Sequence, residues 1–323
     1  MDTPAHIKEA AEMAINNSLP QKSMKRNWQE YDIFMKWAED NDVTIYNEYV
    51  LLAYFQAKSQ NLKSSTLWSI YSMLKSTLNI KQNINIENYS KLIAFLKRTK
   101  DGYVAKKSRI LEIEEIEKFI NEAPDETYLL MKVALIIGMC AACRRHELAS
   151  LKVDEVKVRD DVIVISILET KTKRPRTNCI TEPLWIALIK KYISLRPPNL
   201  QLRRFFLYYA NNKCTRQPVG IHSFGKMPSK IAAYLKLPNA IQYTGHCFRR
   251  SRATLLAGQG ADITTIKRHG NWKSTAVAEG YIEDSLKAKI ALANQLVGRN
   301  TSSFPAAVAS TSSSSFQNIV NEH

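Results

Sequence analysis

The sequence contains six residues whose side chains can together bind a phosphate group and attack it, namely Arg144, Lys171, His246, Arg249, Trp272 and Tyr281. Cationic side chains neutralise the charge that grows on a phosphate under attack, and a tyrosine hydroxyl can form a covalent bond to phosphorus. Arginine suits such a site because its planar guanidinium binds two oxygens at once and stays charged. These residue types therefore predict phosphodiester cleavage with Tyr281 as the nucleophile.

The other members of the set suit the proton transfers of such a reaction. Tyrosine has an ordinary pKa of about 10, so its phenolate costs roughly 4 kcal/mol at pH 7, and nearby cations lower that cost. A lysine can protonate the leaving 5′ oxygen, and His246 can relay or accept a proton because imidazole titrates near neutrality. The indole N–H of Trp272 can donate a hydrogen bond to a phosphate oxygen. Glu147 is expected to orient Arg144, because an unpaired carboxylate beside a phosphate would oppose the cations.

The segments around these residues resemble the catalytic domain of the tyrosine recombinases, a family that includes phage integrases and Xer-, Cre- and Crypton-type enzymes. Arg144 opens an Arg-Arg-His-Glu-Leu stretch similar to the family's R-x-S-E-L pattern, with His146 in the place of a small hydroxyl residue. The family's H-x-x-R appears as His246-Cys247-Phe248-Arg249. Trp272, nine residues before Tyr281, stands where many members have histidine and some have tryptophan. The resemblance covers roughly residues 20 to 297.

This resemblance implies a site-specific DNA recombinase or integrase that works on double-stranded DNA without a metal or another cofactor. Tyr281 would form a 3′-phosphotyrosyl intermediate, which the 5′ hydroxyl of a partner strand resolves. The family's hairpin lysine matches Lys171, which is the expected general acid, with Lys173 as the alternate because it lies on the same side of an extended strand. Four subunits are expected to assemble on paired sites through the residues after Tyr281, chiefly Leu286 to Leu296.

Two other functions stay open at this point. A type IB topoisomerase-like enzyme would nick and close DNA with a similar set of residues but without pairing two sites. A domesticated DNA-binding protein would keep the fold without cleaving, although none of the expected catalytic residues is missing here. Taken singly, each residue also fits an ordinary role, such as a surface ion pair between Arg144 and Glu147.

Composition favours a globular DNA-binding protein. The formal net charge of +16 over 323 residues favours an anionic partner, either nucleic acid or an acidic membrane surface. The longest apolar run, residues 128–143, contains Lys132 and is shorter than the roughly 20 residues of a membrane-spanning helix. No secretion signal is recognisable at the start, so a nuclear location is expected in a eukaryote and a cytoplasmic or nucleoid one otherwise. The five cysteines are expected to be reduced, and the Cys140-x-x-Cys143 pair to be structural.

The spacing of apolar residues predicts a mainly α fold with a small antiparallel β-sheet. Together with the resemblance, it suggests a two-domain DNA clamp. The expected parts are an N-terminal extension (1–19), a helical core-binding domain (20–97), a basic linker (98–110), a catalytic domain (111–297) and a low-complexity tail (298–323). Basic residues in or after the linker and beside the two arginine motifs are candidates for DNA binding: Lys106, Lys107, Arg109, Arg145, Arg250 and Arg252.

Within the predicted catalytic domain, two elements position the site. An apolar helix that begins near residue 128 is expected to end at Arg144 and Glu147. Residues 162–167 have the composition of a strand, and residues 178–180 are expected to return as its partner, so that the basic turn between them carries Lys171 at its tip. A further helix is expected to hold His246 and Arg249 and to run to about Ala257.

Overall fold

The computed structural model of the chain describes residues 3–16, 21–102, 106–170, 174–283 and 285–296. The chain divides into two compact units, with the division between Lys106 and Lys107. This point lies inside the stretch predicted as the linker. Each unit has its own hydrophobic core, and the two are described separately.

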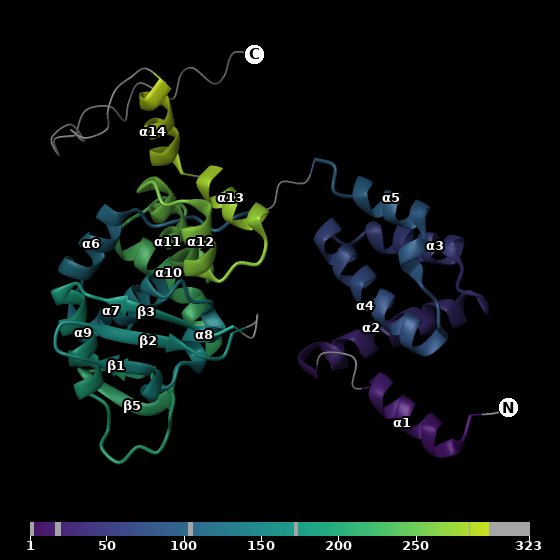
Figure 1. Cartoon of the computed structure of the whole chain (residues 1–323), viewed down its shortest axis with the longest axis horizontal. Helices are drawn as coiled ribbons and strands as arrows, with labels where there is room; N and C mark the ends of the chain where they lie inside the picture. Colours follow the sequence, from purple (N-terminus) through teal and green to yellow (C-terminus); the bar gives the residue numbers. More distant parts are fainter. Residues whose placement is uncertain (1–2, 17–20, 103–105, 171–173, 284, 297–323) are drawn as a thin grey trace. The chain divides into compact units, whose positions relative to one another are not determined.

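The first unit is helical throughout the part of it that the structure describes (Figure 1). Its elements are α1 (Ala5–Asn16), α2 (Gln21–Asp40), α3 (Glu48–Ser59), α4 (Ser64–Gln82), a 3₁₀ turn (Ile86–Asn88) and α5 (Ser90–Arg98). Phe34 of α2 packs with its ring 5.1 Å from that of Tyr54 of α3, and both side chains are fully buried. Asn47 caps α3 by accepting hydrogen bonds from the N–H groups of the first turn. The predicted helices of this region are confirmed.

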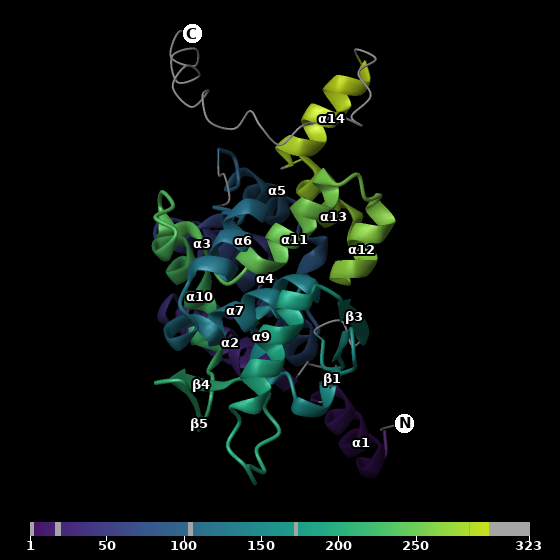
Figure 2. The same ribbon diagram turned by 90° about the vertical axis from the view of Figure 1, so that its left-hand side faces the viewer.

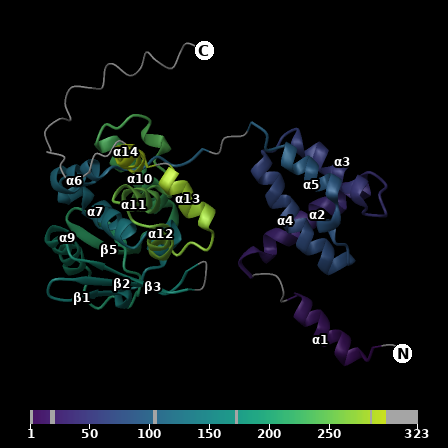
Figure 3. The ribbon, with the colours of Figure 1, turned by 45° about the horizontal axis from the view of Figure 1, so that its top comes forward.

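The second unit surrounds a buried helix, α7 (Asp125–Cys140), whose last two turns are almost entirely apolar. The other helices are α6 (Ile113–Glu122), α8 (Arg145–Ser150), α9 (Pro183–Ser194), α10 (Ile221–Tyr234), α11 (Cys247–Gly258), α12 (Ile263–Gly270), α13 (Thr275–Glu283) and α14 (Leu286–Leu296). Figures 1 and 2 show α11, α12 and α13 side by side, and α14 leading away from them. Figure 3 shows α10 and α11 beneath α14.

The described residues of this unit also form two small antiparallel sheets. The first has the order β1 (Val156–Val158), β2 (Ile163–Ile167) and β3 (Arg176–Ile180). In β2 the side chains of Ile163, Ile165 and Ile167 are buried in alternation with less buried neighbours, which is the period of a half-buried strand. The second sheet pairs β4 (Leu207–Ala210) with β5 (Lys213–Pro218).

The mainly α fold with small antiparallel sheets is confirmed, and the β2–β3 hairpin follows the prediction. Three details differ. β1 and β5 were not predicted, and β5 escapes an apolar pattern because Lys213-Cys-Thr-Arg-Gln-Pro is mostly polar. The apolar helix does not run to Arg144, because α7 ends at Cys140 and the backbone turns through Ala142 in the left-handed region (φ 43°). In the described part of the chain, no helix is long and apolar enough to cross a membrane.

Candidate active site

Arg144 is held at the start of α8 by Glu147. The backbone N–H of Arg144 donates to Glu147 Oε2 at 2.9 Å, and its Nη1 donates to Oε1 of the same carboxylate at 2.7 Å. Glu147 is buried, whereas Arg144 stays partly exposed. The predicted role of Glu147 in orienting Arg144 is consistent with this geometry, because the carboxylate fixes one edge of the guanidinium and leaves other donors for a ligand.

A second arginine, Arg176 at the start of β3, binds the same carboxylate. Its Nη2 donates to Glu147 Oε2 at 2.6 Å, and its Nε and Nη2 donate to the carbonyl of Ala141 at 3.0 and 2.9 Å. Arg176 was not among the predicted site residues. A signal existed: counting back by two from the buried Ile180 places Asn178 and Arg176 on the inward side of the strand.

Arg249 reaches the turn after α7 because α7 and α11 approach closely. A Cβ atom added to Gly138 would lie 2.8 Å from Cδ2 of Phe248, so only glycine allows this contact. The buried guanidinium of Arg249 donates from Nη1 to the carbonyl of Ala142 and from Nη2 to the carbonyl of Gly270. These bonds place Arg249 between the α7–α8 turn and the end of α12.

Trp272 and Tyr281 complete this side of the site. The central carbon of the Arg249 guanidinium lies 4.3 Å from the centroid of the Trp272 ring, which is a cation–π contact. The Trp272 ring lies 5.0 Å from that of Tyr281, which α13 carries, and both side chains are partly buried. A Cβ atom on Gly270 would lie 1.9 Å from Cζ3 of Trp272, so the indole occupies the space that a side chain at 270 would need.

His246 immediately precedes α11 and is exposed to solvent. Partial desolvation of its imidazole lowers its pKa below the ordinary value, and the charges of Arg145, Arg249 and Arg144 lower it further. His246 is therefore neutral at pH 7. A neutral imidazole keeps one nitrogen as an acceptor and one as a donor.

Among the described residues, the site combines several positive charges with one buried carboxylate, that of Glu147. Burial by itself raises the pKa of Glu147, but the hydrogen bond and charge of Arg176, followed by the bonds from Arg144, outweigh it and keep the pKa below the ordinary value. Burial and the nearby charge of Arg144 lower the pKa of Arg249 to about 10, so this side chain remains charged at pH 7. Three guanidinium groups around one carboxylate leave a surplus of positive charge that an anion such as phosphate would neutralise.

The structure brings Arg144, His246, Arg249, Trp272 and Tyr281 into one neighbourhood, through the direct contacts and charge effects given above. Lys171 and Lys173 lie outside the described residues. Asn271 helps to close the same region, because its Nδ2 donates to the carbonyl of Arg174 at 2.8 Å.

The candidate DNA-binding residues occupy different settings. Lys106, Lys107 and Arg145 are exposed. Arg250 and Arg252 are half-buried on α11, and the charge of Arg252 acts on the half-buried side chains of Cys140 and His269.

Arg109 is exposed but already engaged. It donates from Nε to the side chain of Gln242 at 3.0 Å and from Nη1 to the carbonyl of Pro238 at 3.1 Å. Its backbone N–H also donates to the carbonyl of Gln242. These bonds tie the start of the second unit to the segment that precedes His246.

Cys140 and Cys143 are free thiols on either side of the turn after α7, and burial raises their pKa values to about 11 and about 12. A raised thiol pKa is typical of an inert, structural cysteine. Among the described residues, no group of His, Cys, Asp or Glu side chains has the arrangement of a metal site.

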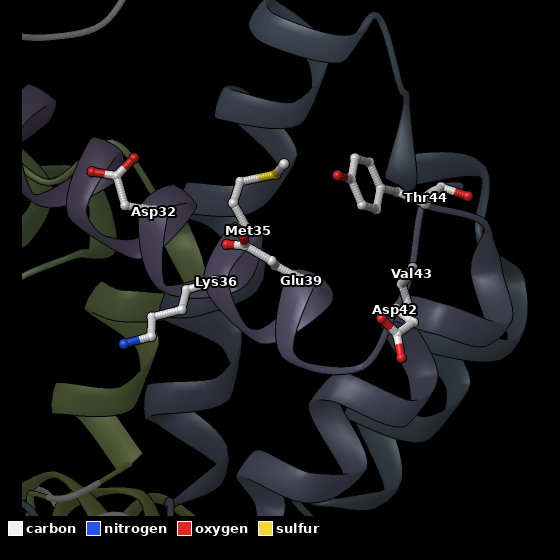
Figure 4. A pocket seen from close by; sticks show the side chains of 8 residues that line it. Asp32, Met35, Lys36, Glu39, Asp42, Val43 and Thr44 are labelled. Atoms are coloured by element: carbon white, nitrogen blue, oxygen red, sulfur yellow. The ribbon is translucent and has the colours of Figure 1, made fainter.

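A surface pocket lies elsewhere, on the first unit. It is lined by residues of α2 and of the segment that follows it: Asp32, Met35, Lys36, Glu39, Asp42, Val43, Thr44 and Tyr46 (Figure 4). Its mostly acidic charged residues do not suit a phosphate, and it includes none of the predicted site residues.

Several solved structures share the fold. The Tn1549 transposon integrase (residues 82–397) in complex with circular intermediate DNA is 15% identical, with a TM-score of 0.61 over 89% of this chain and 97% of that one. The XerH recombinase in its post-cleavage complex with a palindromic difH substrate is 16% identical, with a TM-score of 0.58 over 78% of this chain and 73% of that one. The lambda integrase (residues 75–356) dimer bound to a COC′ core site is 14% identical, with a TM-score of 0.55 over 88% of this chain and 96% of that one. No curated protein matches the sequence.

The model of the phage integrase family matches residues 109–287, which is more than half of the chain. This range includes every residue of the predicted catalytic set. The family match agrees with the fold that the chain shares with the solved recombinase and integrase structures. The resemblance seen in the sequence is thus confirmed, and the chain belongs to the phage integrase family.

Proposed function

We propose that this protein is a site-specific DNA strand transferase that cleaves and rejoins double-stranded DNA through a 3′-phosphotyrosyl intermediate on Tyr281. One observation carries the proposal: a buried arginine, Arg249, and the tyrosine of α13 contact the same indole ring of Trp272. A phosphate bound by Arg249 would therefore lie beside the tyrosine hydroxyl. The same chemistry needs no resident metal ion or nucleotide, since the bond energy is kept in the covalent link.

In the proposed reaction, the Tyr281 oxygen attacks the phosphorus of one phosphodiester. The new bond to phosphorus forms as the bond to the 5′ oxygen breaks, and the departing oxygen takes a proton from a general acid. Lys171, or Lys173 as the alternate, is proposed as that acid on the family resemblance. In the second half-reaction a 5′ hydroxyl attacks the same phosphorus, and the tyrosine oxygen leaves.

Arg144 and Arg249 are proposed to bind the non-bridging oxygens of this phosphate. Their guanidinium groups are anchored by the Glu147 carboxylate and by the carbonyls of Ala142 and Gly270, so little reorganisation is needed when charge develops in the transition state. The neutral imidazole of His246 is suited to accept or relay the tyrosine proton.

The proposed partner is double-stranded DNA, which the net charge of +16 would attract. The related integrases and XerH recombinase named above were solved as DNA complexes. Assembly to a tetramer on two DNA sites is proposed to use α14, whose Leu286 and Leu296 are exposed. The proposed location is therefore the nucleus in a eukaryotic host and otherwise the nucleoid.

The decisive test is covalent trapping on nicked DNA. Sequences that the protein binds are selected from a pool of random duplexes and remade with a single nick, so that the released 5′ strand diffuses away. The wild type is expected to leave an adduct that survives detergent, whereas Tyr281→Phe is expected to bind the same duplexes and form none. An adduct with the phenylalanine variant, or none with the wild type on DNA that it binds, would refute the proposal.

A further inference from the structure

Arg176 links the anchors of the two arginines proposed to bind phosphate. Its side chain is only 7% exposed, although it is charged and lies on β3, an edge strand of its sheet. An arginine is rarely buried unless its donors are paired. Here Nε and Nη2 donate to a carboxylate and two backbone carbonyls, whereas Nη1 is buried without a hydrogen-bond partner in the described part of the chain.

The first anchor is Glu147. One carboxylate oxygen, Oε2, accepts from Arg176 at 2.6 Å, and the other, Oε1, accepts from Arg144 at 2.7 Å. Arg176 and the backbone N–H of Arg144, which donates to the same oxygen at 2.9 Å, together fix the rotation of the carboxylate, and this rotation decides where the Arg144 guanidinium points.

The second anchor is the turn after α7. The carbonyl of Ala142 accepts from Nη1 of Arg249 and also lies within 3.4 Å of Nη2 of Arg176. Ala142 has a positive φ of 43°, a conformation that a residue with a Cβ atom seldom adopts without support from its surroundings. Bonds from both arginines to this turn provide such support.

We infer that Arg176 is a positioning residue that sets the relative placement of Arg144 and Arg249 by holding Glu147 and the Ala142 turn together. The inference rests on the proposed function, because the ligand of the two positioned arginines is the DNA phosphate. Arg176 is not expected to touch the phosphate itself, since its side chain is buried and its Nη2 is already bonded to the Glu147 carboxylate.

Removal of Arg176 has a predictable electrostatic consequence. Burial of Glu147 favours its neutral form, and Arg176 is the largest of the influences that oppose this. Without Arg176 the pKa of Glu147 is expected to rise, so that the carboxyl group takes up a proton at a higher pH than in the wild type. A protonated Glu147 would hold the Arg144 guanidinium less firmly.

The test compares Arg176→Met, Arg176→Lys, Glu147→Gln and the double variant Arg176→Met/Glu147→Gln. Initial rates of covalent adduct formation are measured on the selected nicked DNA over the whole pH range in which the wild type stays folded. Misplacement of catalytic groups by about 1 Å can cost on the order of 10²-fold in rate, so Arg176→Met is expected to be slower by up to that factor at the acid end of this range. Its rate should recover partly as the pH rises and Glu147 ionises.

The double variant decides whether Arg176 acts through Glu147. If it does, adding Arg176→Met to Glu147→Gln should cost much less than it costs in the wild type, and the added pH dependence should disappear. Arg176→Lys keeps a charge for the carboxylate but loses the fork that reaches the carbonyls, so an intermediate rate is expected. A pH-independent loss of equal size in both backgrounds would overturn the inference, as would a wild-type rate for Arg176→Met.

Arg196→Met provides the matched control. Arg196 is another half-buried arginine whose guanidinium donates to backbone carbonyls, including that of Arg204 at 2.9 Å, and among the described residues it makes no hydrogen bond to a proposed catalytic residue. Its removal is expected to lower thermal stability without changing the pH dependence of adduct formation. A pH dependence like that of Arg176→Met in this control would assign the effect to general destabilisation and overturn the inference.

A measurement without DNA separates this inference from the proposed function. The carboxyl carbon of Glu147 can be titrated by NMR in the wild type and in Arg176→Met. A raised pKa in the variant supports the positioning role even if the wild type forms no adduct, an outcome that would refute only the proposed function. An unchanged titration would refute the positioning role even if the wild type cleaves DNA.

Discussion

The guanidinium of Arg249 lies over the indole ring of Trp272, with 4.3 Å between its central carbon and the ring centroid. The same ring is 5.0 Å from the ring of Tyr281, at an interplanar angle of 43°. Trp272 thus contacts both Arg249, which is proposed to bind the phosphate, and Tyr281, the proposed nucleophile. Any change that moves this indole is expected to change the distance between the other two groups.

Trp272→Ala is therefore expected to slow adduct formation more than Trp272→Phe. A cation–π contact contributes about 0.5–2 kcal/mol, which corresponds to a change of roughly twofold to 30-fold in rate if it acts only in the transition state. Phenylalanine keeps an aromatic face for Arg249 and Tyr281 but has no N–H donor. Equal rates for the two variants would show that the indole N–H, rather than the ring, is what the reaction needs.

Gly270→Ala is expected to displace the indole without altering any charged group. The added Cβ atom would lie 1.9 Å from the Trp272 ring, so the ring or the backbone must move, at a cost of about 1–3 kcal/mol. The midpoint temperature of thermal unfolding and the rate of adduct formation are both expected to fall.

Gly280→Ala is the control for this substitution. Gly280 lies within α13, next to Tyr281, and has no atom within 4 Å of an added Cβ. Alanine there is expected to stabilise the helix by about 1 kcal/mol and to leave cleavage intact. If both alanine variants behaved alike, close packing at Gly270 would not be the cause.

Parts of the site whose conformation is set by neighbouring residues in the sequence could be predicted, whereas parts set by distant residues could not. The helix that carries Arg249 was predicted to run to about Ala257, and α11 ends at Gly258. Its close approach to α7 at Gly138 was not predicted. The end of α7 was not predicted either, because no Gly or Pro follows Cys140 in the next ten residues. Ala142 accepts hydrogen bonds from Arg176 and Arg249, which lie 34 and 107 positions further along the chain. Such long-range contacts leave no signal in the residues around the turn.

Arg176 illustrates a second limit. It ends a basic run, Lys171 to Arg176, in which composition alone cannot separate an exposed charge from a buried one. The alternation in β3 places it inward, but this becomes informative only when the strand is known to begin at Arg176. The strand was predicted to begin at residue 178, and Arg176 was therefore assigned to the turn before it.

The protein is expected to lose stability in mild acid through His269. Burial, followed by the charge of Arg252, lowers the pKa of this imidazole to about 4, below the ordinary value of 6.5. The unfolded chain then binds a proton that the folded protein does not, so this contribution is complete above pH 6.5 and is lost as the pH falls toward 4. Between pH 7 and pH 5 the loss is roughly 2 kcal/mol.

Denaturant unfolding of the wild type and His269→Gln at the two pH values measures this contribution. The glutamine variant removes one titrating group and keeps a polar side chain, so the difference in free energy of unfolding between the proteins should shrink at the lower pH. His246 is present in both proteins, so its contribution to the free energy of unfolding cancels in the difference. Parallel stability curves for the two proteins would show that His269 titrates normally.

Leu292→Ser combined with Leu296→Ser is expected to weaken assembly on DNA while leaving the folded monomer unchanged. Both leucines are on α14 and are mostly exposed, at 59% and 82%, so their replacement removes little buried apolar surface from the monomer. Exposed leucines on a helix at the edge of the second unit are suited to bind another subunit, where their burial would stabilise the complex. The mass of complexes formed on two-site DNA should therefore fall below that of a tetramer, whereas binding of one subunit to one site should persist.

Ile241→Ser is the control, because Ile241 is 86% exposed but lies in the Ala240–Gln242 turn rather than on α14. Tetramers of the double variant at the wild-type concentration would exclude these α14 leucines as the contact.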